Sequence, residues 1–417
     1  MTHIAVLGAG ITGVTTAYAL TLRGYDVTVL EYHRYAAMET SFANGGQLSA
    51  CNAEVWNNTS TVVKGMKWMM RRDAPLLMNP RPSWHKYSWM AEFVRNIPHY
   101  RDNTIETARL AIAARDHMFR IAETEQIEFN LERRGILHIF HNAQDFDDAR
   151  KVNTLLTEAG LERNPVTPEE IKSIEPSLTG EYYGGFYTPS DSTGDIHRFT
   201  RGLTEACKKR GVQFRFDADV TGITSLGDGS GVRIDWQDAN APAGQAPEGH
   251  SMQVDGIIIC AGVASRKFAS SLGDRVNIYP VKGYSITVHM DDPDTWDKAP
   301  YVSLLDEDAK IVTSRLGDDR LRVAGTAEYN GYNLDIRADR IDPLIKWTRR
   351  HFDVDTNRVV SWAGLRPMMP NMMPHVGRGK KPGIFYNTGH GHLGWTLAPI
   401  TAETICATLE ADLPVPQ

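Results

Sequence analysis

The stretch VLGAGITG, residues 6–13, decides the fold. A short apolar run of strand length leads into it, and a helical pattern follows it and ends at Gly24. In this arrangement Gly8 permits a tight turn, Gly10 lets the backbone approach a pyrophosphate, and Gly13 lets the helix pack closely on the strand. The helix N-terminus presents free N–H groups and a partial positive charge to phosphates. The stretch therefore predicts a dinucleotide-binding turn.

An acidic residue at the end of a second strand completes the pattern. Val27–Leu30 reads as a strand and is followed by Glu31, about twenty residues after the glycines, where a carboxylate accepts hydrogen bonds from a ribose hydroxyl. A glycine motif alone is a weak signal, because glycine turns also occur by chance in ordinary βαβ units. Strand, glycines, helix, strand and acid in this order predict a Rossmann-like unit that binds a dinucleotide.

The composition and charge limit the class of protein. With 417 residues the chain is too long for one ordinary core, so we expect two domains. It is 41% hydrophobic and 23% charged, as a globular protein is, and its net charge of -6 argues against nucleic acid as the main partner. The four cysteines contain no C-x-x-C pair, so neither a zinc site nor a dithiol pair is indicated, and no metal is expected.

The apolar runs bear on the location of the protein. The glycine strand begins at residue 3, which leaves no room for a signal peptide, so we expect a cytoplasmic protein with reduced thiols. No apolar stretch approaches the ~20 residues of a transmembrane helix. The segment from Lys64 to Met90 mixes Trp and Met with Lys and Arg, as surfaces at a membrane interface do. We favour a helix at a domain edge with its Trp residues buried. Peripheral contact with the inner membrane face is the alternative.

Two kinds of sheet are predicted. Val254–Gly262 is an apolar run that ends in small residues, as a buried parallel strand beside a nucleotide does. Residues 279–325 alternate as strands without helices between them, which implies an antiparallel sheet. Residues 227–231 read as a hairpin turn and residues 238–249 as an exposed loop. The fold class is thus α/β plus α+β, with a Rossmann-like nucleotide-binding domain (residues 1–75, 195–265 and 360–417) interleaved with an antiparallel-sheet substrate domain (residues 76–194 and 266–359).

A second glycine turn lies near the end of the chain. Gly383–Thr388 predicts a strand, residues 389–394 (GHGHLG) repeat the glycine spacing, and residues 395–411 predict a helix. No strand and acid follow, so this turn is expected to aim a helix N-terminus at the first nucleotide rather than to bind another. One nucleotide turn and one such glycine turn suit FAD better than NAD. The second turn would place amides near the pyrimidine edge of the flavin, where negative charge collects on reduction.

Arg366 is the candidate substrate-binding residue. It is expected between a glycine strand end and a proline-stiffened loop within Trp362–Gly377. Its planar fork would give a carboxylate two parallel charge-assisted hydrogen bonds. The alternative is a surface arginine beside a turn.

At this point the chain resembles the small-subunit type of bacterial D-amino acid dehydrogenase, within the wider D-amino-acid-oxidase and glycine-oxidase group of flavoproteins. The resemblance covers nearly the whole chain. The motifs that carry it are residues 6–14 (VLGAGITGV), 39–47 (ETSFANGGQ), 67–69 (KWM) with 74–76 (APL), 193–195 (TGD), 279–285 (YPVKGYS), 364–368 (GLRPM) and 387–396 (NTGHGHLGWT).

The resemblance implies noncovalent FAD and the oxidative deamination of a D-amino acid to a 2-oxo acid and ammonia, with electrons passed to a quinone or another carrier. It also implies that Arg366 holds the substrate carboxylate and that Tyr284 lies in the substrate pocket. We expect hydride transfer from the α-carbon to flavin N5 without a dedicated base, so neither His390 nor His392 is expected to be one. The residues expected to contact FAD are Gly8, Gly10, Ile11, Thr12, Gly13, Glu31, Tyr32, Ser41, Asn44, Gly45, Gly46, Gln47, Leu48, Val220, Cys260, Ala261, Gly262, Gly389, Gly391, His392, Leu393, Gly394, Trp395 and Thr396.

Two other functions stay open at this point. One is an oxygen-using flavin amine oxidase that acts on glycine, sarcosine, a hydroxyproline isomer or a β-amino acid. The other is a flavin-binding protein without turnover. A covalent-flavin sarcosine oxidase is disfavoured, because no cysteine falls near Met368 to Met373. The residues do not predict the side chain of the substrate, the electron acceptor or the oligomeric state.

Overall fold

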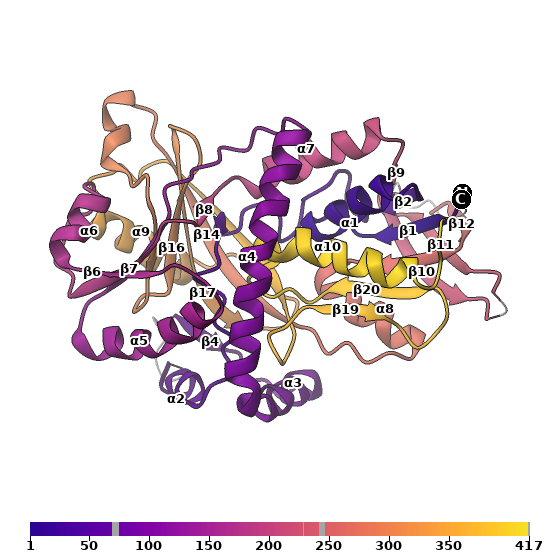
Figure 1. Cartoon of the computed structure of the whole chain (residues 1–417), viewed down its shortest axis with the longest axis horizontal. Helices are drawn as coiled ribbons and strands as arrows, with labels where there is room; N and C mark the ends of the chain where they lie inside the picture. Colours follow the sequence, from indigo (N-terminus) through magenta and orange to yellow (C-terminus); the bar gives the residue numbers. More distant parts are fainter. Residues whose placement is uncertain (69–74, 228, 242–246, 416–417) are drawn as a thin grey trace.

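Two large β-sheets occupy the two ends of an elongated molecule, with the long helix α4 (Tyr100–Thr124) crossing between them (Figure 1). This computed structural model describes residues 1–68, 75–227, 229–241 and 247–415. Both ends of the described chain lie at the same end of the molecule, where the Thr2 hydroxyl donates to the Pro414 carbonyl.

The first sheet has six strands in the order β19-β20-β13-β1-β2-β9. All its pairs are parallel except β19 with β20. The predicted apolar run is split between two sheets, since β12 ends at Val254 and β13 starts at Gly256. The strands of the sheet are β1 (His3–Leu7), β2 (Asp26–Leu30), β9 (Gln213–Arg215), β13 (Gly256–Ile259), β19 (His375–Arg378) and β20 (Ile384–Thr388).

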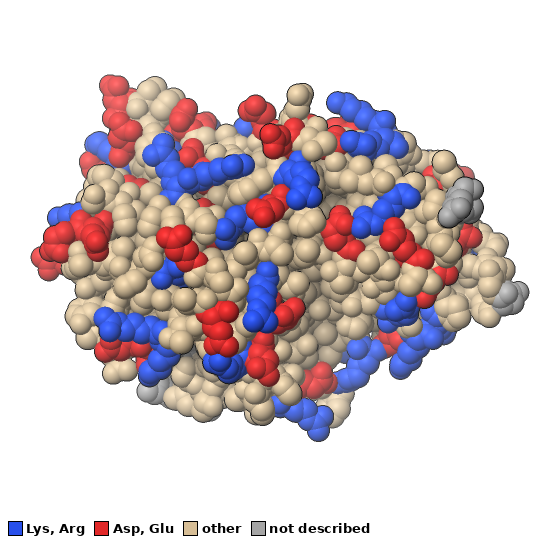
Figure 2. All heavy atoms as spheres, in the orientation of Figure 1, with Lys and Arg blue, Asp and Glu red and all other residues tan. Residues whose placement is uncertain are grey.

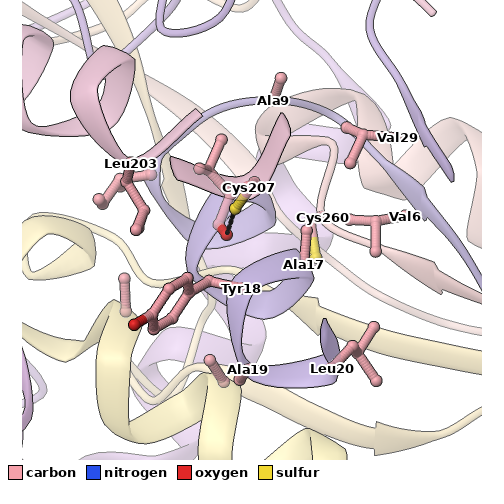
Figure 3. Packing of buried hydrophobic residues seen from close by; sticks show 14 of the residues in the cluster. Val6, Ala9, Ala17, Tyr18, Ala19, Leu20, Val29, Leu203, Cys207 and Cys260 are labelled. Atoms are coloured by element: carbon pink, nitrogen blue, oxygen red, sulfur yellow. Dashed lines mark hydrogen bonds between the residues drawn. The ribbon is translucent and has the colours of Figure 1, made fainter. Parts of the chain in front are cut away.

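Both faces of this sheet are buried, as parallel sheets require. Ile4 and Val6 face a core cluster that includes α1 (Ile11–Leu22), α7 (Ile196–Lys209) and α10 (Gly394–Glu410). Figure 3 shows this packing around α1, where the Cys207 thiol points at the backbone of the helix. Ala5 and Leu7 face the opposite cluster, beneath α8 (Ser265–Leu272) and the three-stranded antiparallel sheet β10 (Ala218–Ser225), β11 (Val232–Asp238) and β12 (Gly249–Val254).

The loops of the small sheet follow the sequence-based predictions. The glycines at 227, 229 and 231 all have positive φ in the β10–β11 hairpin, so the predicted turn is confirmed. The predicted loop lies between β11 and β12, although its residues 242–246 are outside the described part of the chain. The four cysteines are free and buried.

The second sheet has nine strands, ordered β18-β14-β17-β16-β15-β5-β7-β6, with β4 also paired to β17. It is mainly antiparallel, as predicted, but β5 with β15 and β4 with β17 are parallel. These partners come from distant segments, so no hairpin fixes their direction. The strands are β4 (Leu76–Met78), β5 (Ile136–Phe140), β6 (Asn164–Val166), β7 (Gly184–Thr188), β14 (Tyr279–His289), β15 (Ser303–Asp306), β16 (Ile311–Arg315), β17 (Arg320–Tyr329) and β18 (Val359–Met368). The short strands β3 (Gln47–Leu48) and β8 (Ser192–Thr193) pair separately.

Helices beside both large sheets begin where local signals place them. Helix α6 starts with the predicted Pro168 and has a capping box between Thr167 and Glu170. Asp195 caps α7 by accepting hydrogen bonds from two backbone N–H groups. The other helices are α2 (Thr59–Trp68), α3 (Trp84–Arg95), α5 (Ala143–Glu158) and α9 (Ala338–His351), with 3-10 turns at Ile97–His99, Gly262–Ala264 and Pro293–Lys298.

The aromatic segment is only partly buried. Trp89 is 2% exposed, as predicted, but Trp84 is 82% exposed, so the prediction was wrong for that residue. Trp84 is the first residue of α3, next to the cap Ser83, and points away from the core. Residues 69–74, which the prediction also covered, lie outside the described part of the chain. Within the described residues, no helix is long and apolar enough to cross a bilayer. Lys, Arg, Asp and Glu side chains are mixed over the face shown in Figure 2.

Candidate active site

One large cavity runs between the two sheets. It is bordered by the carboxyl ends of β1, β2 and β13 on one side and by β14, β17 and β18 on the other. Its volume of about 1390 Å³ exceeds the roughly 300–1,000 Å³ of a typical small-molecule pocket. The cavity is therefore large enough for a dinucleotide together with a small second molecule.

The first glycine turn has no room for larger residues. Gly8 has φ +102°, and a Cβ on it would lie 2.8 Å from the Cys260 carbonyl oxygen. A Cβ on Gly13 would lie 1.9 Å from the Gly8 oxygen, so the steric roles expected for both glycines are confirmed. Gly10 caps α1 without a side-chain hydrogen bond, and the Ile11 N–H donates to Ser41 Oγ at 3.0 Å. The helix start thus borders the cavity through Gly8, Gly10, Ile11 and Thr12.

Glu31 lies where the sequence predicts an acid, at the end of β2 beside this turn. Its Oε2 accepts from the Ala9 N–H at 2.6 Å, and its Oε1 accepts from the His33 N–H at 2.9 Å. Burial raises the pKa of the carboxyl, and the two backbone donors partly oppose that effect. The carboxylate is held in place at the cavity wall, beside the predicted pyrophosphate site.

The second glycine turn lines the same cavity as the first. Gly389 and Gly391 have φ +76° and +60°, and the Gly391 N–H donates to the Pro367 carbonyl at 3.0 Å. The turn therefore contacts β18 one residue beyond Arg366. The Trp395 Nε1–H donates to the Gly46 carbonyl at 3.3 Å. This bond joins the start of α10 to residues 39–49, a stretch of mostly small residues that we call the small-residue loop. His390 fills the turn, with Nε2 2.9 Å from the Thr401 hydroxyl.

Most of the residues predicted to contact FAD border this cavity, and three do not. Gly13 lies behind Gly8, and Leu48 is in the apolar core. The Thr396 hydroxyl accepts from the Ser49 N–H at 3.1 Å, so it supports the loop from behind. The residues that border the cavity are Gly8, Gly10, Ile11, Thr12, Glu31, Tyr32, Ser41, Asn44, Gly45, Gly46, Gln47, Val220, Cys260, Ala261, Gly262, Gly389, Gly391, His392, Leu393, Gly394 and Trp395. Their contacts with FAD stay a prediction.

Arg366 lies at the other end of the cavity. It is inside β18, paired with Val281, and not between a strand end and a loop as expected, because β18 continues through Pro367 to Met368. Its Nη1 donates to the Thr326 carbonyl at 3.3 Å, and no carboxylate of the described residues forms an ion pair with it. Burial lowers the pKa of the guanidinium to about 10. Arg366 thus lines the cavity as a cation that has no ion-pair partner among the described residues.

Tyr284 borders the cavity, but its hydroxyl does not point into it. The ring packs in the core cluster with Ile286 and Leu344, and the hydroxyl donates to Glu328 Oε2 at 2.6 Å. Side chains alternate along a strand, so the neighbours of Tyr284 on β14 point to the opposite face of the sheet. Among these neighbours, the Ser285 hydroxyl reaches the Ala43 carbonyl in the small-residue loop.

Tyr329 is a pocket residue that sequence reasoning missed. It lies on β17, borders the cavity, and is near enough to Arg366 for their charges to interact. No described residue hydrogen-bonds to its hydroxyl, and burial raises the pKa of that group. The alternation of side-chain directions along β17 would not have placed Tyr329 at the cavity. Thr326 has φ +59° and lies at a register shift opposite Gly283, and this shift interrupts the alternation.

An apolar wall was also missed. It borders the same cavity and comes from the segment before β4, from β4 and from α3. Its residues are Trp56, Leu76, Met78, Trp89, Met90 and Phe93. Leu76, Met78, Trp89 and Met90 belong to the segment that was predicted as a domain-edge helix with buried Trp residues, and only the fold brings the six residues together.

A charged branch of the cavity had no sequence signal either. The imidazole of His138 lies 3.2 Å from Cys51 Sγ and 2.9 Å from Glu307 Oε1. Glu307 also pairs with Lys310 at 2.5 Å. Burial raises the pKa of the Cys51 thiol well above its usual range, so this cysteine is a protonated thiol at neutral pH. The four residues come from three distant segments of the chain.

The two glycine turns, the acid at the end of β2 and the unpaired cavity cation together define a nucleotide-dependent redox enzyme. The chain matches the family model of the FAD dependent oxidoreductases (DAO) over residues 3–408 and belongs to that family. It is 61% identical over 417 residues to D-amino acid dehydrogenase 3 of Mesorhizobium japonicum, covering all of this chain and 98% of the relative. It is 38% identical to the D-amino acid dehydrogenase of Paramagnetospirillum magneticum, covering 95% of this chain and 92% of the relative.

Solved structures support the same fold. Glycine oxidase from Geobacillus kaustophilus superposes with a TM-score of 0.75 at 18% identity, covering 99% of this chain and 96% of the other. The predicted fold class and the predicted relation to D-amino acid dehydrogenases are therefore confirmed, and so is FAD as the cofactor. The cavity fits FAD, because its glycine cradle has no room for a Cβ at Gly8 and its volume exceeds that of a single small ligand.

Proposed function

We propose that this flavoenzyme oxidises a D-amino acid to its 2-oxo acid and ammonia through an imine and passes the electrons to a quinone or another carrier. The names of its sequence relatives support the substrate class. The observation that carries the proposal is Arg366, a half-buried guanidinium that lines the cavity and has no ion-pair partner among the described residues. Once a ligand fills the cavity and excludes water, a cation without a partner is costly, so a carboxylate of the ligand is its expected counter-ion.

The two donors at this end of the cavity suit a carboxylate. Arg366 would give it two parallel hydrogen bonds, and the Tyr329 hydroxyl, without a partner in the described chain, would add a third. Tyr284 would act through its hydrogen bond to Glu328, which also pairs with Lys282 at 3.2 Å. These contacts would hold rigid the sheet that carries Arg366 and Tyr329, the two residues of the proposed carboxylate clamp. We therefore assign carboxylate binding to Arg366 and Tyr329, and a positioning role to Tyr284.

FAD, when bound, supplies the hydride acceptor at flavin N5. The residues of this chain would fix the substrate so that its α-hydrogen faces that acceptor, and holding two reactants in place supplies much of the rate. The apolar wall at Trp56, Trp89 and Phe93 would receive the side chain and exclude water from it. We accordingly expect apolar D-amino acids to be preferred over charged ones.

The test starts with the cofactor and the substrate. The purified protein is expected to be yellow, with absorbance near roughly 450 nm from oxidised flavin. Anaerobic mixing with a panel of D- and L-amino acids should bleach that band with D-enantiomers only. If no amino acid bleaches it, the protein binds flavin without this turnover. Peroxide formed in air, in place of dye reduction, would favour the oxygen-using amine oxidase.

Arg366→Lys tests the clamp directly. A point charge replaces a planar fork, so we expect the loss of most activity on amino acids, by about a hundredfold. Arg378→Lys is the matched control, because Arg378 is an exposed arginine paired with Asp412. Unchanged turnover in Arg366→Lys would place the carboxylate elsewhere.

We further infer peripheral contact with a membrane through α3. Its residues Trp84 and Tyr87 are 82% and 49% exposed, and Val94 near its other end is 50% exposed. Exposed aromatic groups beside cations suit a membrane interface. Sedimentation with anionic vesicles should carry the wild type down and leave Trp84→Ser in solution. If the wild type stays in the supernatant, this surface has another role.

A further inference from the structure

We propose that His392 recognises the α-amino group of the substrate, accepting a hydrogen bond from it at Nδ1. The inference rests on the proposed function, because it supplies a partner for the amine of the same ligand. It goes beyond the carboxylate clamp, which would hold a carboxylic acid equally well with or without an amine. It also differs from a general-base role, since the imidazole receives a hydrogen bond and is not required to keep a proton.

The tautomer of His392 is set by its neighbour. Its Nε2 lies 3.1 Å from the main-chain oxygen of Asn52. A carbonyl oxygen only accepts, so Nε2 must carry the hydrogen, and a neutral ring then has its lone pair at Nδ1. The ring is also stacked on Trp56, with centroids 4.8 Å apart and planes at 20°. These two contacts fix both the orientation of the ring and the nitrogen that can accept.

Nδ1 is free to meet a ligand. Within the described chain no group hydrogen-bonds to it, and it is not among the buried polar atoms that protein closes off from solvent. His392 borders the large cavity, so the open nitrogen faces that space. His390, two residues earlier, is buried, whereas His392 is half-buried. Of the two histidines in the turn, His392 is therefore the more accessible to a ligand.

His392 also lies at the correct end of the cavity. The Gly391 N–H donates to the Pro367 carbonyl, and His390 forms a β-bridge with Met368, so the turn is joined to β18 next to Arg366. The nearby charge of Arg366 contributes to the low pKa of His392, after the larger effect of burial, which brings it to about 4. The imidazole is therefore neutral when amino acids bind, and it would not repel an ammonium group.

Two carboxylates that border the cavity already have partners of their own. Glu54 borders it, but its Oε1 already accepts from the Tyr100 hydroxyl at 2.6 Å. Glu307 is paired with Lys310 and His138. A site built to hydrogen-bond a polar group rejects ligands that lack it, because the site group is then left unpaired. His392 would give this cavity its preference for amino acids over other carboxylic acids.

Two substitutions separate the acceptor from the rest of the ring. His392→Asn keeps an oxygen near the position of Nδ1 and loses the donor to Asn52. His392→Gln keeps a donor near the position of Nε2 and places no acceptor at the position of Nδ1. His392→Phe keeps the stacking on Trp56 without either nitrogen and serves as a second acceptor-free variant if Gln prevents FAD binding. FAD content and melting temperature are measured for each variant.

The ligands are D-phenylalanine and 3-phenylpropanoate, which share a carbon skeleton and differ in the amine. Binding of 3-phenylpropanoate to the FAD-loaded protein is measured by calorimetry. Binding of D-phenylalanine is taken from the concentration dependence of anaerobic flavin bleaching. We expect His392→Gln and His392→Phe to weaken the binding of D-phenylalanine by about tenfold to a hundredfold. The affinity for 3-phenylpropanoate should stay within about twofold of the wild-type value. His392→Asn should recover part of the lost affinity for D-phenylalanine.

The possible results separate the two proposals. If D-amino acids bleach the wild-type flavin and the variants weaken the binding of both ligands equally, His392 has only a structural role and this inference fails. It also fails if neither ligand is affected. If no amino acid bleaches the wild type, the proposed function fails and amine recognition fails with it.

Discussion

Gly283 is the position at which one added methyl group should disable the arginine clamp. A Cβ on Gly283 would lie 2.4 Å from Nη2 and 2.5 Å from both Cζ and Nη1 of Arg366. Ordinary contacts begin at about 3.4 Å, so in Gly283→Ala the guanidinium must move by about 1 Å. That movement also breaks its hydrogen bond to the Thr326 carbonyl. A misplacement of about 1 Å can cost about a hundredfold in rate.

We therefore expect Gly283→Ala to lower kcat/KM for D-amino acids by about tenfold to a hundredfold, which corresponds to ~1.4–2.7 kcal/mol. The loss should lie mainly in KM, since the carboxylate contact is what moves. The FAD content of the variant should be unchanged, because Gly283 lies on β14 in the nine-stranded sheet. Steady-state kinetics with a dye acceptor measure both parameters.

Gly222→Ala is the matched control for this experiment. Gly222 is also a glycine inside a strand, β10, and a Cβ on it would meet Asp235 Oδ2 at an ordinary 3.4 Å. Its kinetics should equal those of the wild type. A Gly283→Ala enzyme with unchanged KM and normal FAD content would refute the reasoning, because the guanidinium would then be free to function from another position.

Two other substitutions test the fold and its response to pH. Gly13→Ala should yield protein that loses FAD or does not fold, because its Cβ would lie 1.9 Å from the Gly8 oxygen; recovery of stable yellow protein would contradict this steric argument. His141→Asn should lower the melting temperature at pH 5.5 and have less effect at pH 9. The hydrogen bond to Asp306 raises the pKa of His141, so its stabilisation is present below pH ~6.5 and is lost as the pH rises through the higher folded pKa. Burial opposes the ionisation of Asp306, but hydrogen bonds from His141 and Trp347 lower its pKa overall. The stabilisation that Asp306 contributes is therefore present above pH ~3.8 and is lost as the pH falls through the lower folded pKa. The pair of His141 and Asp306 should contribute about 0.5–1 kcal/mol to the free energy of unfolding. An equal effect of His141→Asn on the melting temperature at both pH values would show that the charge is not involved.

The parts of the site that the sequence predicted are those with local causes. A tight turn requires glycine, so Gly8 and Gly13 could be assigned their roles before the cavity was known. Helix starts have the same local character, as at Thr167 and Asp195, where one side chain satisfies free backbone N–H groups. Arg366 was singled out from its sequence neighbours and again from the resemblance to a family, but its place at the cavity depends on the pairing of β18 with β14.

The parts that the sequence did not predict depend on how strands are paired. Tyr284 was expected in the pocket, yet its hydroxyl bonds to Glu328, while Tyr329 borders the same cavity beside Arg366. The register shift at Thr326 reverses which side chains of β17 face the cavity beyond it, and no local pattern marks that shift. Trp84 and Trp89 read alike in the sequence, because only the docking of α3 distinguishes the buried one from the exposed one.

The small-residue loop at residues 39–49 is held by the nine-stranded sheet, and this couples the two sides of the cavity. Three successive carbonyls of the loop accept hydrogen bonds from three different strands of that sheet. The pairs are Ala43 with Ser285 Oγ at 2.7 Å, Asn44 with Arg322 Nη1 at 3.0 Å, and Gly45 with Ser314 Oγ at 2.6 Å. Separation of the sheet from the loop would leave the three carbonyls without these donors, at roughly 1–3 kcal/mol for each group. Arg322 would lose its contact at Nη1 and keep the hydrogen bond from Nε to the Thr287 hydroxyl within the sheet. The sheet and the loop are therefore expected to move as one body. Entry of the substrate should depend on the wall at α3, where Trp89, Met90 and Phe93 line the cavity with apolar side chains.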